Sequence, residues 1–156
     1  MLHSTTQGEY KMTMMYSVID FEKKTIIYSS AAHNPILVYR PSKFSFLSHG
    51  RKTKRPFCKL SGRTSNSLGY TYGSVYTSQI QELQTDDVIL WFTDGLIENM
   101  NAEHEMFGMR KLRGVLKTAE GMSAEDIKTR IVKAILDHHG QTNFEDDVTL
   151  IVGKMR

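Results

Sequence analysis

The chain has 156 residues, a formal net charge of +3 and a single cysteine. This length suffices for one domain with its own hydrophobic core. One cysteine excludes an internal disulfide framework and a multi-thiolate metal site, and it fits a reducing cytoplasm. The longest apolar stretches are far shorter than the roughly 20 residues of a membrane span, and we expect neither such a span nor a signal peptide.

The charges are unevenly distributed along the chain. Residues 1–22 carry a net charge of −2, residues 23–81 contain ten basic and no acidic residues, and residues 82–156 carry a net charge of −5. Basic segments bind nucleic acid, membrane surfaces or phosphorylated partners. A solvated basic face without a binding function is the alternative, and the charge pattern leaves both open.

The first half of the chain is typical of β-structure. Alternating residues and β-branched side chains predict strands, and residues 20–24 and 49–50 predict turns. The predicted strands are residues 12–19, 25–30 and 36–39, with a weaker one at 44–47. Residues 51–74 are rich in Lys, Arg, Ser, Thr and Gly, which indicates a long basic loop insertion or two poorly ordered strands.

The next segment returns to strand patterns. Residues 75–83 alternate again, and Asp86 and Asp87 predict a turn. The apolar run that follows, Val88–Phe92, suits a strand buried on both faces.

The last third is mostly helical. Apolar residues recur at helical spacing in residues 106–117 and 123–139. Ser123 and Asp126 predict a capping box at the start of the second helix, and Gly140 predicts its end. A buried strand at 148–152 closes the chain, so the order of elements favours an α+β domain built on antiparallel sheet.

Two acidic motifs lie at the ends of predicted buried strands. Asp94 and Gly95 follow the strand at 88–92, and Asp146 and Asp147 precede the strand at 148–152. Carboxylates from both motifs would form an all-oxygen site of the kind that Mg²⁺ and Mn²⁺ prefer. Each motif alone is more often a turn or a strand-end cap.

Five segments resemble, in order, the motifs of the SpoIIE-like branch of the PPM-type Ser/Thr phosphatases. The family motifs are a Tyr-x-Asn-Ala-Gly-His-x-Pro run, a Leu-Gly pair, an Asp-strand-Thr-Asp-Gly core, a Phe-Gly helix start and a final Asp-Asp-x-Thr-Leu strand. In this chain they match residues 28–35, 68–69, 86–98, 107–112 and 145–152. The match covers nearly the whole chain.

The resemblance implies a single domain over residues 1–156, with two packed antiparallel β-sheets flanked by helices and a two-metal site for Mn²⁺ or Mg²⁺. Carried over, Asp94 and Asp146 are the metal ligands that support catalysis. Asp147 is a further candidate ligand, and Gly95 allows close approach to the site. Metal ions that clamp phosphoryl oxygens and activate water need no protein nucleophile.

The resemblance also implies bacterial signalling, with a phosphorylated regulatory protein of the anti-sigma-factor antagonist type as substrate. The basic residues Arg51, Lys52, Lys54 and Arg55 are candidates for binding that substrate. The family's earlier Asp motif, followed by Gly-His-Gly, is absent, so the chain resembles the C-terminal two-thirds of the domain. We therefore expect weakened metal binding and an exposed sheet surface that favours self-association.

Other functions are weighed against this one. A catalytically degenerate interaction domain is the main alternative, and a nucleic-acid-binding module is disfavoured because no fold signature accompanies the basic stretch. A cysteine-dependent phosphatase fails because Cys58 and Arg63 are five residues apart instead of six. His138 and His139 are adjacent helix residues that point in different directions.

Overall fold

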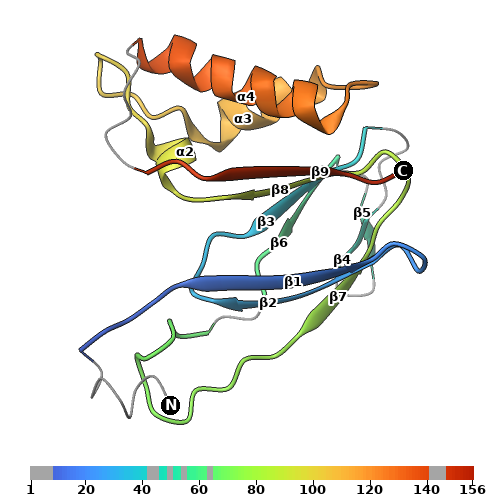
Figure 1. The fold of residues 1–156 in the computed structure, drawn as a ribbon, viewed down its shortest axis with the longest axis vertical. Helices are drawn as coiled ribbons and strands as arrows, with labels where there is room; N and C mark the ends of the chain where they lie inside the picture. The colour runs from blue at the N-terminus through green and yellow to red at the C-terminus, as the bar shows by residue number, and fades with distance from the viewer. Residues whose placement is uncertain (1–8, 42–45, 49–50, 54–55, 63–64, 141–146) are drawn as a thin grey trace.

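The computed structural model describes residues 9–41, 46–48, 51–53, 56–62, 65–140 and 147–156, which form nine strands and three helices (Figure 1). In chain order they are β1 (Met14–Asp20), β2 (Thr25–Ala31), β3 (Ile36–Tyr39), β4 (Phe46–Ser48), β5 (Arg51–Thr53), β6 (Phe57–Leu60), β7 (Gln79–Glu82), β8 (Val88–Phe92), α2 (Gly95–Glu98), α3 (Gly108–Lys117), α4 (Ala124–His139) and β9 (Leu150–Lys154). None of the described helices is long and apolar enough to cross a membrane.

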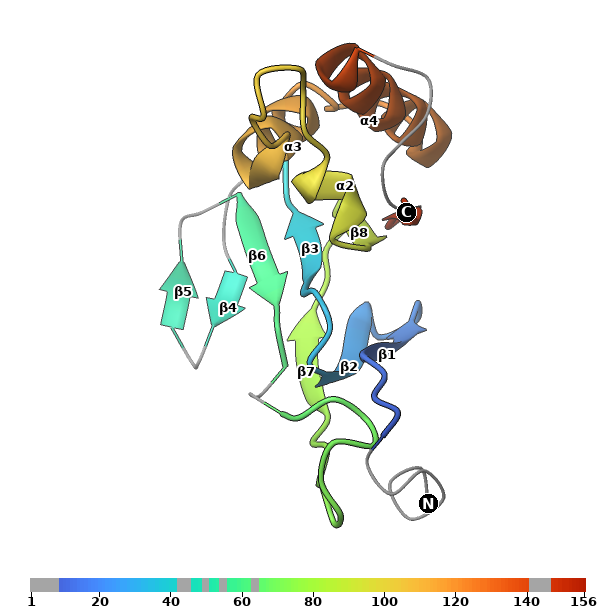
Figure 2. The same cartoon turned by 90° about the vertical axis from the view of Figure 1, so that its left-hand side faces the viewer.

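The elements form three layers. One sheet has the order β1-β2-β7, the other has the order β6-β3-β8-β9, and every pairing within them is antiparallel. Helices α3 and α4 cover one face of the four-stranded sheet, and the three-stranded sheet lies on its other face (Figure 1). The β4–β5 hairpin is a separate two-stranded unit (Figure 2). The predicted α+β class and the two packed antiparallel sheets are confirmed.

Strand β8 contributes to two hydrophobic clusters because its side chains alternate between the faces of the sheet. Val88, Leu90 and Phe92 pack in the cluster that includes α3 and α4. Ile89 and Trp91 pack in the cluster between the two sheets. The prediction of a strand buried on both faces is therefore confirmed.

Helix α4 begins and ends where its sequence signals predict. Ser123 accepts a hydrogen bond from the Asp126 amide, Asp126 bonds back to Ser123, and Gly140 ends the helix in the left-handed conformation. The buried residues of this helix are Ile127, Ile131, Ile135 and His139. These positions recur every four residues, so one face of α4 packs towards the sheet.

The outer face of the three-stranded sheet carries exposed apolar side chains. Val18 pairs with Ile27, and Ile27 pairs with Ile80, so the three form one row across the sheet. Their exposed fractions are 45%, 39% and 65%. Within the described residues, helices cover only the four-stranded sheet, and self-association through the outer face of the other sheet stays a prediction.

The described part of residues 51–74 contains two strands, which is one of the two alternatives that its composition indicates. Of these, β6 pairs with β3 and ends at buried Leu60. Two later strands differ from their predicted boundaries. Strand β7 is shorter than residues 75–83 because its ladder with β2 includes only Gln79–Glu82. Strand β9 is shifted two residues later than predicted because it pairs with β8 from Phe92↔Leu150 to Val88↔Lys154.

A buried ion pair lies where β8 begins. Arg40 Nε donates to Asp87 Oδ1 at 2.7 Å, and Arg40 Nη2 donates to Asp87 Oδ2 at 2.6 Å. The two side chains are only 3% and 0% exposed. The Gln84 amide also donates to Asp87 Oδ2 at 2.8 Å, so several donors satisfy the buried carboxylate.

We expect Asp87→Ala to lower the free energy of unfolding by about 3–5 kcal/mol, because it leaves the buried Arg40 guanidinium without its carboxylate counter-charge. Urea unfolding followed by circular dichroism measures the change. The matched control is Asp137→Asn, which breaks the exposed Lys133–Asp137 pair and should cost less than about 1 kcal/mol. A loss for Asp87→Ala as small as that of the control would show that the pair does not anchor β8.

Candidate functional site

Asp94 lies at the junction of β8 and the short helix α2. Its carbonyl accepts hydrogen bonds from the amides of Ile97 and Glu98, at 2.8 and 2.9 Å. Its side chain is exposed and makes no capping hydrogen bond to the helix. The helix therefore holds the backbone of Asp94 while its carboxylate stays available to a ligand.

Thr93 joins this junction to the segment before β9. The Thr93 amide donates to the Thr149 carbonyl at 3.1 Å, and the Thr149 amide donates to Thr93 Oγ1 at 3.0 Å. The Thr93 hydroxyl donates in turn to the Asp147 carbonyl at 3.2 Å. Since paired strands lie about 4.8 Å apart, these bonds bring Asp94 and Asp147 to the same end of neighbouring strands.

The other predicted ligands are only partly described. Gly95 is buried in the first turn of α2, and Asp147 is exposed. Asp146 lies outside the described residues, so its distance from Asp94 stays untested. Among the residues that the structure describes, no group of three or more His, Cys, Asp or Glu side chains could hold a metal ion.

Of the four predicted substrate-binding residues, the structure describes the backbone of two. Arg51 and Lys52 lie in β5, whose backbone pairs with β4, and their side chains are not described. Lys54 and Arg55 lie outside the described residues. Their role in substrate binding stays a prediction.

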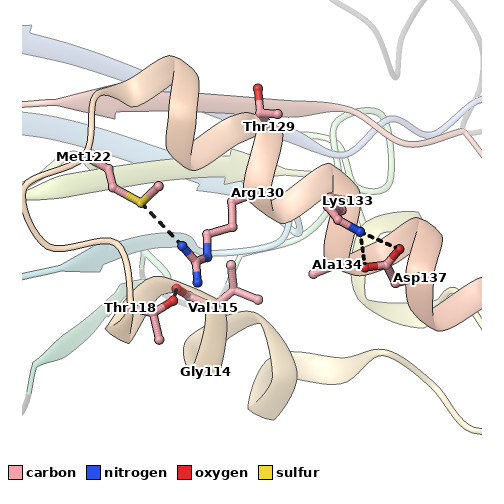
Figure 3. A pocket seen from close by; sticks show the side chains of 9 residues that line it. All are labelled: Gly114, Val115, Thr118, Met122, Thr129, Arg130, Lys133, Ala134 and Asp137. Carbon is pink, nitrogen blue, oxygen red and sulfur yellow. Dashed lines mark hydrogen bonds and ion pairs between the residues drawn. The ribbon is translucent and has the colours of Figure 1, made fainter.

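A groove of about 640 Å³ lies between α3 and α4 (Figure 3). Its charged residues are Arg130, Lys133 and Asp137, and Lys133 pairs with Asp137 at 2.7 Å. Arg130 Nη1 contacts Met122 Sδ at 3.9 Å. Because its one carboxylate is already paired, this groove offers no metal ligand comparable to Asp94.

Cys58 and the two adjacent histidines take no part in this site. Burial raises the pKa of the Cys58 thiol, which disfavours the reactive thiolate. His138 bonds Lys111 Nζ and the Glu105 carbonyl, whereas His139 bonds the Met100 carbonyl. The histidines hold the end of α4 to the loop before α3, so they do not share a ligand.

Three features were missed by sequence reasoning: the Arg40–Asp87 pair, the hydrogen bonds of Thr93, and a pocket lined by Arg110, Arg113 and Lys117 of α3. The Thr93 contact had a signal, since a Thr precedes Asp94 and another, Thr149, follows Asp147 by two residues. The buried pair had none, because Asp87 reads as a turn residue and Arg40 follows an ordinary strand.

Comparison with known proteins places these features in context. The family model described as Stage II sporulation protein E (SpoIIE) matches residues 1–156. A curated relative, Protein IcfG from Synechocystis sp. (strain ATCC 27184 / PCC 6803 / Kazusa), is 24% identical over 151 residues. That match covers 95% of this chain and 22% of the relative, so the chain spans less than a quarter of its length.

Solved structures show the same fold at low identity. The SiaA-PP2C domain of Pseudomonas aeruginosa matches with a TM-score of 0.71 at 14% identity, covering 92% of this chain and 52% of that one. The RsbU and RsbW domains of Rv1364c from Mycobacterium tuberculosis match with a TM-score of 0.66 at 22% identity, covering 99% and 40%. The Mn-presoaked phosphatase domain of SpoIIE from Bacillus subtilis matches with a TM-score of 0.61 at 15% identity, covering 92% and 56%. The chain thus spans about half of these solved chains.

We expect Thr93→Val to loosen the contact between the Asp94 junction and β9. The variant keeps the shape of the side chain but removes the acceptor of the Thr149 amide and the donor to Asp147. Because Thr149 is exposed and water can replace the bonds, the free energy of unfolding should fall by only about 0.5–1.5 kcal/mol. Hydrogen exchange should show faster exchange at the Thr149 amide.

The control for this variant is Thr129→Val, at an exposed position of α4. It should leave the exchange rate of the Thr149 amide unchanged and alter stability by less than about 0.5 kcal/mol. An unchanged Thr149 rate in Thr93→Val would contradict the proposed link between the two acidic motifs.

Proposed function

The chain belongs to the family of Stage II sporulation protein E (SpoIIE), and we propose that it forms part of a metal-dependent phosphatase domain that hydrolyses phosphoserine or phosphothreonine on a signalling protein. The observation that carries this proposal is the set of Thr93 hydrogen bonds, which brings the Asp94 junction beside Asp147. Asp94 then presents an exposed carboxylate on a backbone held by β8 and α2. A site on rigid elements suits chemistry that depends on position.

The residues present fit Mn²⁺ or Mg²⁺, because both ions prefer oxygen ligands. Asp94 and Asp146 would hold the metal, and Asp147 is a further candidate beside them. When bound, such an ion would neutralise charge on phosphoryl oxygens. It would also lower the pKa of a bound water, so that this water can act as hydroxide near neutral pH. The similar SpoIIE phosphatase domain from Bacillus subtilis was presoaked with Mn, which supports this choice of ion.

The proposed substrate is a phosphorylated regulatory protein of the anti-sigma-factor antagonist type. This part of the proposal rests on the family, in which such proteins are the expected partners. The net charge of +10 over residues 23–81 favours a phosphorylated or acidic partner over a basic one.

A degenerate domain that binds the partner without hydrolysing it is the second candidate. The observation that favours it is the lack of a third ligand near Asp94 among the described residues. The two candidates differ in whether metal binds at Asp94, and this difference can be measured.

The first measurement is the affinity for Mn²⁺, determined by isothermal titration calorimetry. We expect Asp94→Asn to weaken Mn²⁺ binding by roughly tenfold to a hundredfold or more. Changing a group that only hydrogen-bonds to a metal ligand already costs that much, and Asp94 would be a ligand itself. Asp137→Asn removes an exposed carboxylate on α4 and should leave Mn²⁺ affinity unchanged. Equal affinity in wild type and Asp94→Asn would remove Asp94 from the site.

The second measurement is Mn²⁺-dependent hydrolysis of a phosphoserine peptide. It compares this chain with a version extended upstream of Met1, each with and without Asp94→Asn. We expect activity in the extended version and its loss in the Asp94→Asn variant. If the extended version is folded and inactive with Mn²⁺, the degenerate domain is the better description, and unchanged activity in Asp94→Asn would refute the catalytic assignment.

A further inference from the structure

A basic pocket of about 430 Å³ lies between α3 and the start of β6. Its charged lining residues are Arg110, Arg113 and Lys117, and no acidic residue is among the described residues that line it. The full lining is Pro56, Phe57, Arg110, Arg113, Gly114 and Lys117.

The three cations share one face of α3. Their spacing of three and four residues places them one above another along the helix. An adjoining face carries Leu112 and Leu116, which are fully buried in the core. The packing of α3 on the sheet therefore fixes the cations at the surface of the pocket.

Arg113 is the central group of the pocket. Its Nε is buried and has no hydrogen-bond partner within the described part of the chain. Its guanidinium carbon lies 5.3 Å from the centre of the Phe57 ring, so the ring limits its movement. An unpaired buried donor on a charged group is costly, and an oxyanion in the pocket would remove that cost.

The surroundings of the pocket narrow the class of ligand. The Phe57 ring stacks on Tyr39 at 4.9 Å and also contacts Arg113, so it leaves little free face for a nucleobase. Burial, and to a smaller extent the charge of Glu120, raises the pKa of Tyr39, which stacks on Phe57. The described lining of the pocket itself contains three cations and no carboxylate.

Phe57, which lines the pocket, and the candidate metal motif are level with different ends of β8. Phe57 pairs with Tyr39, and Tyr39 pairs with Val88, the first residue of β8. Asp94 lies two residues after Phe92, the last residue of the same strand. Because a strand rises about 3.3 Å per residue, β8 spans about 13 Å between the level of Phe57 and the end that leads to Asp94.

We propose that the pocket formed by Arg110, Arg113 and Lys117 binds a phosphoryl group, either as inorganic phosphate or as the phosphate of a phosphorylated side chain. Two guanidinium groups offer paired N–H donors that match a tetrahedral oxyanion. A phosphate dianion balances three cations better than a carboxylate does. The proposal does not depend on phosphatase activity, because the pocket is separate from the Asp94 junction.

The experiment is an NMR titration of the 156-residue chain, with EDTA present and ionic strength held constant. The probes are inorganic phosphate, a phosphoserine peptide and the same peptide with unmodified serine. We expect the Nε–Hε signal of Arg113 to shift saturably with both phosphate probes and not with the serine peptide. Tighter binding of the phosphopeptide would identify a partner protein as the source, and tighter binding of phosphate would identify the free ion.

Variants separate the pocket from general charge attraction. Arg113→Gln should weaken phosphate binding by roughly tenfold to a hundredfold, the loss expected for a hydrogen bond to a charged group. Arg130→Gln removes an equal charge from the neighbouring groove, which Figure 3 shows, and should bind phosphate like the wild type. If Arg113→Gln does not fold, the exposed pair Arg110→Gln and Lys117→Gln tests the same pocket with Arg113 intact.

Three outcomes would overturn the proposal. They are an Arg113 signal that phosphate does not move, equal binding by wild type and the pocket variants, and equal binding of the serine peptide and the phosphopeptide. Because no divalent metal is present, none of them bears on hydrolysis at Asp94, and a failure of either proposal leaves the other standing.

Discussion

The buried pair between Arg40 and Asp87 is the constraint on which the rest of the fold depends. Arg40 follows β3, its side chain also reaches the Glu82 carbonyl at the end of β7, and its amide donates to the Pro56 carbonyl before β6. The Asp87 carbonyl accepts from the Met155 amide after β9. One ion pair thus joins the ends of strands from both sheets, and its geometry specifies their arrangement even where its net contribution to stability is small.

Strand β8 carries that constraint to the candidate site. It is fixed at its start by Asp87 and at its end by the hydrogen bonds of Thr93, and its side chains are held by cores on both faces. The backbone that leads into Asp94 therefore has little freedom. Neither anchor touches the Asp94 carboxylate, so stability and ligand binding are assigned to different residues.

The elements that the sequence predicted best are those with local signals. Strands β3 and β8 are continuous apolar runs, and α4 has a capping box and a glycine stop, so their bounds follow from a few neighbouring residues. Strand β6, the register of β9 and the pair of Arg40 with Asp87 depend on residues 18 or more positions away. Local patterns carry no information about such partners, and the same holds for Arg113, whose pocket forms only when α3 lies against β6.

The two places proposed to bind phosphate are reached from different ends of β8: Phe57, beside Arg113, is level with Val88, and Asp94 follows the other end of the strand. A single phosphoryl group is about 3 Å across its oxygens, far less than the length of about 13 Å that β8 spans between these two levels. A partner that used both would need either two phosphoryl groups or an extended segment of at least about four residues between an anionic group and the reacting one. The fold therefore favours a protein partner over a small phosphate ester wherever both places act together, since only a polypeptide spans that distance while presenting a phosphorylated side chain to the Asp94 end.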